Sequence, residues 1–348
     1  MHRGNAPFAR RVVDWQKQHG RNDLPWQGTQ DPYRVWLSEV MLQQTQVATV
    51  RDYYARFLNR FPDVQSLASA TLDDVLALWS GLGYYSRARN LHACAQAVVR
   101  EHGGQFPRLA AALETLPGIG RSTAAAIASI CFGERAAILD ANVRRVLARL
   151  LRFEGDLAQA RAVQTLWTQA TALLPAGRTA ATEMPRYTQG LMDLGATVCL
   201  PRNPQCGACP VQPLCAAHQA GDVLRYPVRS RTLRRSSQSI WLLWAQTPAG
   251  AVWLHPRPTP GVWAGLHCLA LFDSEAALLA VLPHTVRDQA QALPVQTHAL
   301  THKDLHLHTW RVTLPARQLP RCEGRWVAST DWPSLGLPAP IRALLQKK

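Results

Sequence analysis

Four cysteines lie within a proline-rich segment of 17 residues. Thiolates this crowded repel one another unless a cation neutralises them, so four unrelated thiols are a poor interpretation of the segment. Structural zinc sites usually combine two short C-x2–4-C pairs, whereas the spacing here is C-x6-C-x2-C-x5-C, with a single short pair. This spacing favours the corners of a 4Fe-4S cluster, with zinc as the alternative. The candidate metal ligands are Cys199, Cys206, Cys209 and Cys215.

One carboxylate, Glu39, stands in the nearly uncharged segment VWLSEVMLQQTQVATV, residues 35–50. The segment has helical character, and its apolar side chains should partly remove Glu39 from water. Desolvation raises the pKa of a carboxyl group toward neutrality, which prepares it to act as a general acid. The alternative is a Glu on a solvated helix face. The polar neighbours are Ser, Thr and Gln rather than charged residues, which favours the interpretation of Glu39 as a general acid.

A second carboxylate, Asp140, follows the apolar residues 136–139 and precedes the helical pattern NVRRVL at residues 142–147. An Asp in this place is most simply an N-cap. The positive end of the helix dipole also favours an ionised side chain, which suits a group that stabilises a developing positive charge. Capping is the simpler interpretation of Asp140 taken alone, and the two roles can coexist.

Residues 108–132 predict two helices joined by the turn Leu116-Pro117-Gly118-Ile119-Gly120. The proline ends the first helix, the two glycines permit a positive φ, and the second helix should begin near Arg121 or Ser122. Bare backbone N–H groups at a helix N-terminus form an anion site, which suits a DNA phosphate. An ordinary tight helical hairpin explains this segment equally well. The positive net charge of the whole chain favours the interpretation as a DNA-phosphate site.

The chain has 348 residues, which predicts two or three globular domains. Its formal net charge is +15, with 34 Arg and only 4 Lys. Arginine matches the geometry of phosphate, so this surplus favours a nucleic-acid partner. No lipidation motif or basic amphipathic helix points to a membrane surface, and the sequence predicts neither a membrane span nor a secretory signal. A cytoplasmic protein is therefore expected.

The elements that must position these residues change character along the chain. Helical spacing dominates up to about residue 222, and residues 64–79 show it clearly. Residues 223–239 carry five Arg and no acid, which predicts a basic linker that can also contact phosphate. Short β-like runs rich in Trp follow, separated by Pro and Gly. They predict a separate α/β domain of about 110 residues.

Several segments together resemble a known family. LPGIGRSTAAAI resembles the helix-hairpin-helix of the endonuclease III superfamily, and the cysteine spacing resembles its 4Fe-4S loop. SEVMLQQTQV, GLGYYSRARNL, LDANVRRVLAR and YTQGLMDLGATVC resemble its adenine DNA glycosylases. The resemblance implies a mainly α fold, a helix-hairpin-helix glycosylase fold (six-helix barrel plus 4Fe-4S domain) with a C-terminal α/β Nudix-like domain. The implied parts are an N-terminal helix (1–24), the barrel (25–138), the cluster domain (139–222), the linker (223–238) and the Nudix-like domain (239–348).

The family excises adenine mispaired with 8-oxoguanine or guanine after flipping the base out of the duplex. By resemblance, Glu39 protonates a ring nitrogen of the departing adenine, Asp140 stabilises the oxocarbenium-like sugar, and Asn142 supports this chemistry. Bifunctional lyases of the superfamily carry a Schiff-base lysine where this chain has Ser122. No Lys occurs between Lys17 and Lys303, so a monofunctional glycosylase is expected.

The resemblance also assigns residues that contact the substrate, which would be double-stranded DNA with an adenine:8-oxoguanine or adenine:guanine mispair bound by a monomer. The adenine pocket is assigned to Trp26, Leu42 and Gln189, other DNA contacts to Gln43, Gln44, Tyr84, Leu116, Gly118, Gly120 and Ser122, and 8-oxoguanine sensing to Thr301 and His302.

In the C-terminal part, PGVWAGLHCLALF resembles a Nudix-like domain, but the acidic catalytic Nudix box is absent, so this domain should bind rather than hydrolyse. Leu300-Thr301-His302 stands where the family has Phe-Ser-His, which removes the aromatic ring and keeps a hydroxyl. Four nearby histidines suggest a metal tract as the alternative to a half-buried strand. They are His298, His302, His306 and His308.

The sequence argues against three other functions. A lyase acting on oxidised pyrimidines is opposed by the missing lysine, and a Nudix hydrolase with an added DNA domain is opposed by the missing acidic box. A DNA-binding module without activity has no need for Glu39 in an apolar segment.

Overall fold

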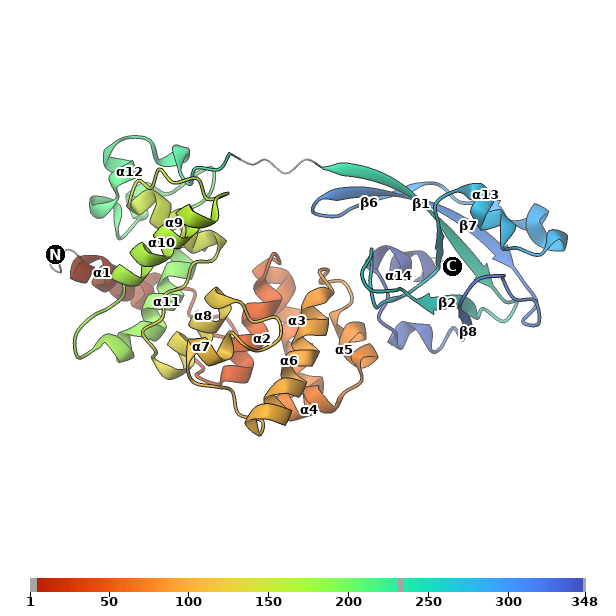
Figure 1. Ribbon diagram of the computed structural model, residues 1–348, viewed down its shortest axis with the longest axis horizontal. Helices are drawn as coiled ribbons and strands as arrows, with labels where there is room; N and C mark the ends of the chain where they lie inside the picture. Colours follow the sequence, from red (N-terminus) through yellow and green to blue (C-terminus); the bar gives the residue numbers. More distant parts are fainter. Residues whose placement is uncertain (1–4, 231–234, 347–348) are drawn as a thin grey trace. The chain divides into compact units, whose positions relative to one another are not determined.

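The computed structural model describes residues 5–230 and 235–346 and divides into two compact units (Figure 1). One unit comprises residues 1–68 and 93–232, and the other comprises residues 69–92 and 233–348.

The predicted domain boundaries stay a prediction. Residues 69–92, which the sequence assigned to the barrel, group with the C-terminal unit. Part of the predicted basic linker, residues 231–234, lies outside the described residues.

Helices make up most of the first unit, together with four short 3-10 turns or single-turn helices around the cysteines. The helices of the chain up to residue 225 are α1 (Asn5–His19), α2 (Pro32–Leu42), α3 (Val47–Arg60), α4 (Val64–Ser69), α5 (Leu72–Trp79), α6 (Ser86–His102), α7 (Ala110–Leu113), α8 (Arg121–Phe132), α9 (Ala141–Leu150), α10 (Ala160–Ala172), α11 (Ala180–Thr197), η1 (Cys206–Ala208), η2 (Gln212–Leu214), α12 (Ala216–Gln219) and η3 (Val223–Arg225).

Helix α11 is central to the first unit because it packs against α1, α8 and α9. Two glycines make this close packing possible. A Cβ on Gly190 would lie 2.8 Å from Val12 Cγ1 on α1, and a Cβ on Gly195 would lie 2.7 Å from Asn142 Cβ on α9. A glycine inside a helix costs about 1 kcal/mol relative to alanine. Because Gly195 has no side chain, the N-terminal end of α9 can approach α11 closely.

The helical segment predicted at residues 64–79 forms two helices, α4 and α5. Thr71 interrupts it: its side chain accepts a hydrogen bond from the backbone N–H of Asp74, and the Asp74 carboxylate accepts one from the N–H of Thr71. This reciprocal capping box starts a new helix at Leu72.

The second unit is built on a mixed sheet whose order is β3-β2-β1-β7-β5, with β4 paired to β1, β6 to β7 and β8 to β2. The long strands β1 and β7 run parallel, with Ile240 opposite Leu307. Buried residues such as Leu243, Leu278 and Val312 form a core between the sheet and α13. The elements are β1 (Ser236–Gln246), β2 (Val252–Pro256), β3 (His267–Cys268), β4 (Ala270–Phe272), α13 (Glu275–Ala280), η4 (His284–Gln289), β5 (Gln291–Ala292), β6 (Gln296–Ala299), β7 (Lys303–Thr313), β8 (Arg325–Val327), η5 (Trp332–Ser334) and α14 (Ala339–Gln346).

The histidine tract belongs to this sheet. His298 lies on β6, whereas His306 and His308 lie on β7. The ring of His308 stacks on Trp241 with 4.6 Å between centroids, and His306 Nε2 hydrogen-bonds Ser237 Oγ at 2.6 Å. His298, His306 and His308 thus lie on two paired strands of the sheet, as the interpretation of a half-buried strand expects.

The predicted fold class, mainly α with a C-terminal α/β domain, is confirmed. Within the residues that the structure describes, no helix is long and apolar enough to cross a membrane.

Candidate active site

The two candidate catalytic carboxylates line one pocket of the first unit, which has a volume of about 630 Å³. This is within the usual range for a small-molecule site, about 300–1,000 Å³. Nine of the residues predicted from the sequence line it: Trp26, Glu39, Leu42, Gln43, Gln44, Ser122, Asp140, Asn142 and Gln189.

Glu39 is held in the pocket by helix α2. Asp31 caps this helix by accepting the N–H of Tyr33, and Pro32 occupies its first turn. Most of α2 is buried, including Trp36 and Met41. Glu39 is half-buried, because its carboxyl group lies deep among protein atoms but faces the pocket.

Burial raises the pKa of Glu39 to about 7, and the negative charge of Asp140 adds to the rise. A carboxyl group with this pKa carries a proton in a large fraction of molecules at neutral pH. Glu39 is therefore able to donate a proton to a group bound in the pocket.

Asp140 is the N-cap of α9, and its Oδ1 accepts the N–H of Val143 at 2.8 Å. Burial raises the pKa of Asp140, while the N–H groups of Val143 and Asn142 and the charge of Arg145 oppose the rise. The sequence predicted that the helix end would favour the ionised form. That effect is present, but the desolvation of Asp140 outweighs it.

Ser122 connects the predicted hairpin to Asp140. Helix α8 begins at Arg121, and the hydroxyl of Ser122 accepts the backbone N–H of Leu139 at 3.0 Å. Leu139 immediately precedes Asp140, so Ser122 fixes the chain that delivers this carboxylate.

The hairpin turn uses its two glycines differently. Gly118 has a φ of 74°, the left-handed conformation that favours glycine, whereas Gly120 has a φ of −87°. The expectation of positive φ is thus wrong for Gly120. A Cβ there would meet open space, and Gly120 caps α8 without a side-chain hydrogen bond. The N-terminal N–H groups of α8 lack a side-chain cap, as an anion site requires. Leu116 is buried beneath the turn.

Two of the predicted DNA contacts have unusual backbones. Gln44, at the rim of the pocket, has a φ of 59°, and Tyr84, in the second unit, has a φ of 49°. Residues other than glycine adopt this conformation at a cost of order 1–3 kcal/mol, and such residues cluster at functional sites.

The residues predicted to sense 8-oxoguanine lie in the second unit. The hydroxyl of Tyr84 hydrogen-bonds the hydroxyl of Thr301, and both side chains are exposed, as is His302. The second unit therefore carries its own small polar surface at Tyr84, Thr301 and His302.

Arg145, which sequence reasoning missed, links Asn142 to the cysteine segment. Its guanidinium donates to Asn142 Oδ1 at 2.9 Å, to the carbonyl of Gly195 at 2.7 Å and to the carbonyl of Cys199 at 2.7 Å. The side chain of Asn142 is therefore held in place from one side. A buried Arg at helical spacing within the apolar pattern of α9 was the signal available in the sequence.

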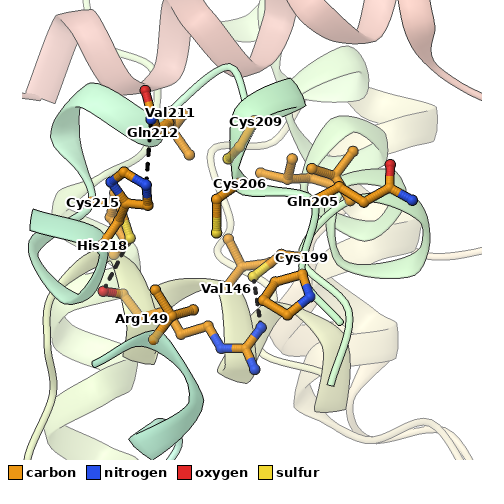
Figure 2. A pocket seen from close by; sticks show the side chains of 15 residues that line it. Val146, Arg149, Cys199, Gln205, Cys206, Cys209, Val211, Gln212, Cys215 and His218 are labelled. Carbon is orange, nitrogen blue, oxygen red and sulfur yellow. Dashed lines mark hydrogen bonds between the residues drawn. The ribbon is translucent and has the colours of Figure 1, made fainter. Parts of the chain in front are cut away.

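The four cysteines surround a second pocket of the first unit (Figure 2). Burial raises the pKa of Cys209 to about 11, and the neighbouring cysteines add to the rise. Four thiols around one apolar pocket are the donor set of a 4Fe-4S cluster, and none of the described residues that line the pocket is acidic. The residues present therefore fit the cluster that the spacing predicts.

Arg149, one turn after Arg145, is the cationic residue of this second pocket and is only 2% exposed. Its guanidinium donates to Cys199 Sγ at 3.4 Å (Figure 2). It also donates to the carbonyl of Leu200 at 2.6 Å and to the carbonyl of Tyr226 at 3.1 Å. It joins the start of the cysteine loop to the chain that follows it, and its charge opposes that of the thiolates.

Family comparisons match three parts of the chain. Residues 37–169 match the HhH-GPD superfamily of base excision DNA repair proteins, residues 199–215 match the iron-sulfur binding domain of endonuclease III, and residues 240–347 match the NUDIX domain. The helix-hairpin-helix fold, the 4Fe-4S cofactor and the Nudix-like C-terminal domain are thereby confirmed.

Individual relatives agree with these matches. The adenine DNA glycosylase of Buchnera aphidicola subsp. Schizaphis graminum is 32% identical over 345 residues, which cover 97% of this chain and 98% of the relative. That of Rattus norvegicus is 48% identical over 221 residues, 61% of this chain and 42% of the relative. A thermostable thymine-DNA glycosylase structure is 28% identical with a TM-score of 0.52, covering 61% of this chain and 95% of its own.

Proposed function

Since the chain belongs to the adenine DNA glycosylase family, we propose that it removes adenine mispaired with 8-oxoguanine or guanine. It is a DNA glycosylase of base excision repair, with an iron–sulfur loop and a Nudix domain. The observation that carries the proposal is the single pocket that holds a protonatable Glu39 next to Asp140.

The proposed reaction begins with a base that has been flipped out of the duplex into this pocket. Glu39 donates its proton to a ring nitrogen of the adenine. The bond from the base to the deoxyribose then breaks, and its electron pair leaves with the base. The sugar becomes an oxocarbenium ion, which the negative charge of Asp140 stabilises until water adds to it. Asn142, held by Arg145, supports this arrangement.

The reaction should stop at the abasic site. A lyase needs an amine nucleophile, and no Lys occurs between Lys17 and Lys303. At the hairpin, Ser122 uses its hydroxyl to hold Leu139. These two observations favour a monofunctional glycosylase.

The other assigned residues bind DNA in the proposal. The turn at Gly118 and Gly120 would hold a backbone phosphate at the start of α8. Gln43 and Gln44 would contact the duplex beside the pocket that contains Trp26, Leu42 and Gln189. A net charge of +15 supports binding to DNA. In the proposal the protein binds as a monomer.

Cys199, Cys206, Cys209 and Cys215 would hold the 4Fe-4S cluster. When bound, the cluster joins four separate thiolates into one covalently linked loop. Arg149 would place its positive charge next to that anionic group and Arg145 would connect the loop to Asn142.

Base release from a duplex with adenine opposite 8-oxoguanine tests the function. We expect free adenine to appear, with strand breakage only after alkali treatment. Breakage without alkali would establish a lyase instead, and a duplex that retains its adenine would overturn the proposal.

Thr301→Ala tests the proposed 8-oxoguanine sensor. The substitution removes the hydroxyl that pairs with Tyr84, and we expect the preference for 8-oxoguanine over guanine opposite adenine to fall several-fold, since one hydrogen bond contributes about 0.5–1.5 kcal/mol. The measurement is the ratio of kcat/KM for the two duplexes. Thr301→Ser retains the hydroxyl and should retain the preference, as should Thr313→Ala at an exposed position on β7. An unchanged ratio in Thr301→Ala would remove this residue from the sensor.

A further inference from the structure

Asp193 is a buried acid that the proposed reaction does not use. It lies on α11, one turn after Gln189, and its side chain is 0% exposed. An isolated buried carboxylate is strongly destabilising unless it is paired and hydrogen-bonded. The hydrogen-bond partners of the Asp193 carboxylate therefore indicate its role.

Three N–H groups point at the carboxylate of Asp193. Its Oδ1 accepts Arg21 Nε at 2.8 Å and Gln189 Nε2 at 3.1 Å, and its Oδ2 accepts the backbone N–H of Arg21 at 3.1 Å. Arg21 and Gln189 both line the pocket that holds Glu39. Asp193 thus lies behind the wall of that pocket and is bonded to two residues of the wall.

The chemistry of the carboxylate fixes the orientation of the Gln189 amide. A glutamine amide has a donor end and an acceptor end, whereas a carboxylate only accepts. Gln189 must therefore turn its NH2 group to Asp193. The amide oxygen is the end that remains for a base bound in the pocket.

We propose that Asp193, held by Arg21, is a positioning residue that presents Gln189 to the flipped base as a hydrogen-bond acceptor and so selects a base with an exocyclic amine. This inference rests on the proposed function. Adenine carries an amine that donates to such an oxygen. Hypoxanthine, which differs from adenine in carrying an oxygen at that position, places an acceptor against an acceptor.

Asp193→Asn is the sharpest variant because it keeps the size of the side chain and removes its acceptor-only character. The asparagine NH2 group must face either Arg21 Nε and Gln189 or the backbone N–H of Arg21. If the NH2 group faces Gln189, Gln189 must turn its amide oxygen to the asparagine. If the NH2 group faces the backbone N–H of Arg21, Gln189 can keep its NH2 group turned to the asparagine oxygen. The orientation of Gln189 is then no longer fixed.

The experiment measures single-turnover rate constants for release of adenine and of hypoxanthine, each opposite 8-oxoguanine. We expect the wild-type protein to prefer adenine and Asp193→Asn to reduce that preference about tenfold or more, because the Gln189 amide is then free to present its NH2 group to the base in place of its oxygen. Asp14→Asn, an exposed acid on α1, is the matched control and should leave the preference unchanged. Visible absorbance of the iron–sulfur cluster verifies that each variant is folded.

A second set of variants tests whether Asp193 acts through Gln189. Gln189→Leu should also lose the preference, and the double variant with Asp193→Asn should lose no more than Gln189→Leu does. If Asp193→Asn does not fold, Arg21→Lys takes its place as the test. This variant keeps the buried charge of Asp193 paired but loses the Nε donor, so we expect a smaller loss of preference, about two- to tenfold.

The outcomes separate this inference from the proposed function. If the wild-type protein releases no adenine, the proposed function fails. If it releases adenine but Asp193→Asn and Arg21→Lys keep the full preference, or slow both bases equally, the positioning role alone is overturned. A further loss of preference in the double variant would also overturn it.

Discussion

Glu39→Gln should slow adenine release by about 10²–10⁴-fold, the usual contribution of a general acid. Glutamine has the size and shape of the protonated carboxyl group but does not give up a proton to the departing base. Trp26 and Gln189 still line the pocket, and the substitution leaves the proposed DNA contacts at Gln43, Gln44 and the hairpin turn unchanged. The dissociation constant for a mispaired duplex should therefore change by no more than a few-fold. Single-turnover base release and equilibrium binding to the same duplex measure the two effects.

The pH dependence of base release should identify the proton that is lost. The pKa of Glu39 is raised to about 7, and the acid must be protonated to act. The rate of the wild-type protein should therefore fall as the pH rises through about 7, whereas the residual rate of Glu39→Gln should lack this decline. A variant that keeps its rate, or that loses binding as much as release, would show that Glu39 has a structural role.

The same substitution should stabilise the protein at high pH. The pKa of Glu39 is raised from 4.5 to about 7 by folding, so stability is highest below the unfolded value and is lost as the pH rises through about 7. A shift of this size corresponds to about 3 kcal/mol at 1.36 kcal/mol per unit. Above pH 8, Glu39→Gln should therefore have a higher free energy of unfolding in urea than the wild-type protein. Glu101→Gln, at an exposed position on α6, should not.

Local signals predicted the elements of the catalytic pocket well where the sequence contained both a cap and a periodic pattern. Residues 142–147 predict a helix, and Asp140 caps α9 directly before it. The start of α8 at Arg121 also agrees with the turn that precedes it. The break between α4 and α5 was missed although Thr71 and Asp74 have capping-box spacing, because the apolar periodicity continues across the break.

The partners of the buried charges could not be predicted from the sequence. Arg145 and Arg149 interrupt the apolar pattern of α9, which indicates burial but not where the guanidinium groups bond. Their acceptors include the carbonyls of Cys199 and Tyr226, about 50 and 80 residues further along the chain. The Arg21–Asp193 pair is similarly distant in sequence. Such contacts arise only when helices with separate local signals pack together.

The direction of the pKa shift of Asp140 could not be predicted from the sequence either. The helix N-terminus is visible in the sequence and favours the ionised form. The burial that outweighs it comes from the packed pocket around Asp140, to which residues from Arg21 to Gln189 contribute. The sign of a pKa shift depends on both terms, and only one of them is local.

Asp140→Asn separates the two roles that the sequence left open. Asparagine caps helices about as well as aspartate, so the side chain can still accept the N–H of Val143 and α9 should remain intact. Only the negative charge is lost. If Asp140 stabilises the oxocarbenium ion, adenine release should fall by about 10²–10³-fold in single-turnover assays, the scale seen when one electrostatic contact to a transition state is removed.

A second consequence concerns the neighbouring acid. The charge of Asp140 contributes to the raised pKa of Glu39, so the pKa of Glu39 in Asp140→Asn should fall below about 7. The residual rate should then decline at a lower pH than in the wild-type protein. Asp31→Asn is the matched control, since Asp31 caps α2 in the same way and does not line the pocket. If Asp140→Asn behaved like this control in both rate and pH profile, Asp140 would be a helix cap alone, and the positive charge on the sugar would require another partner.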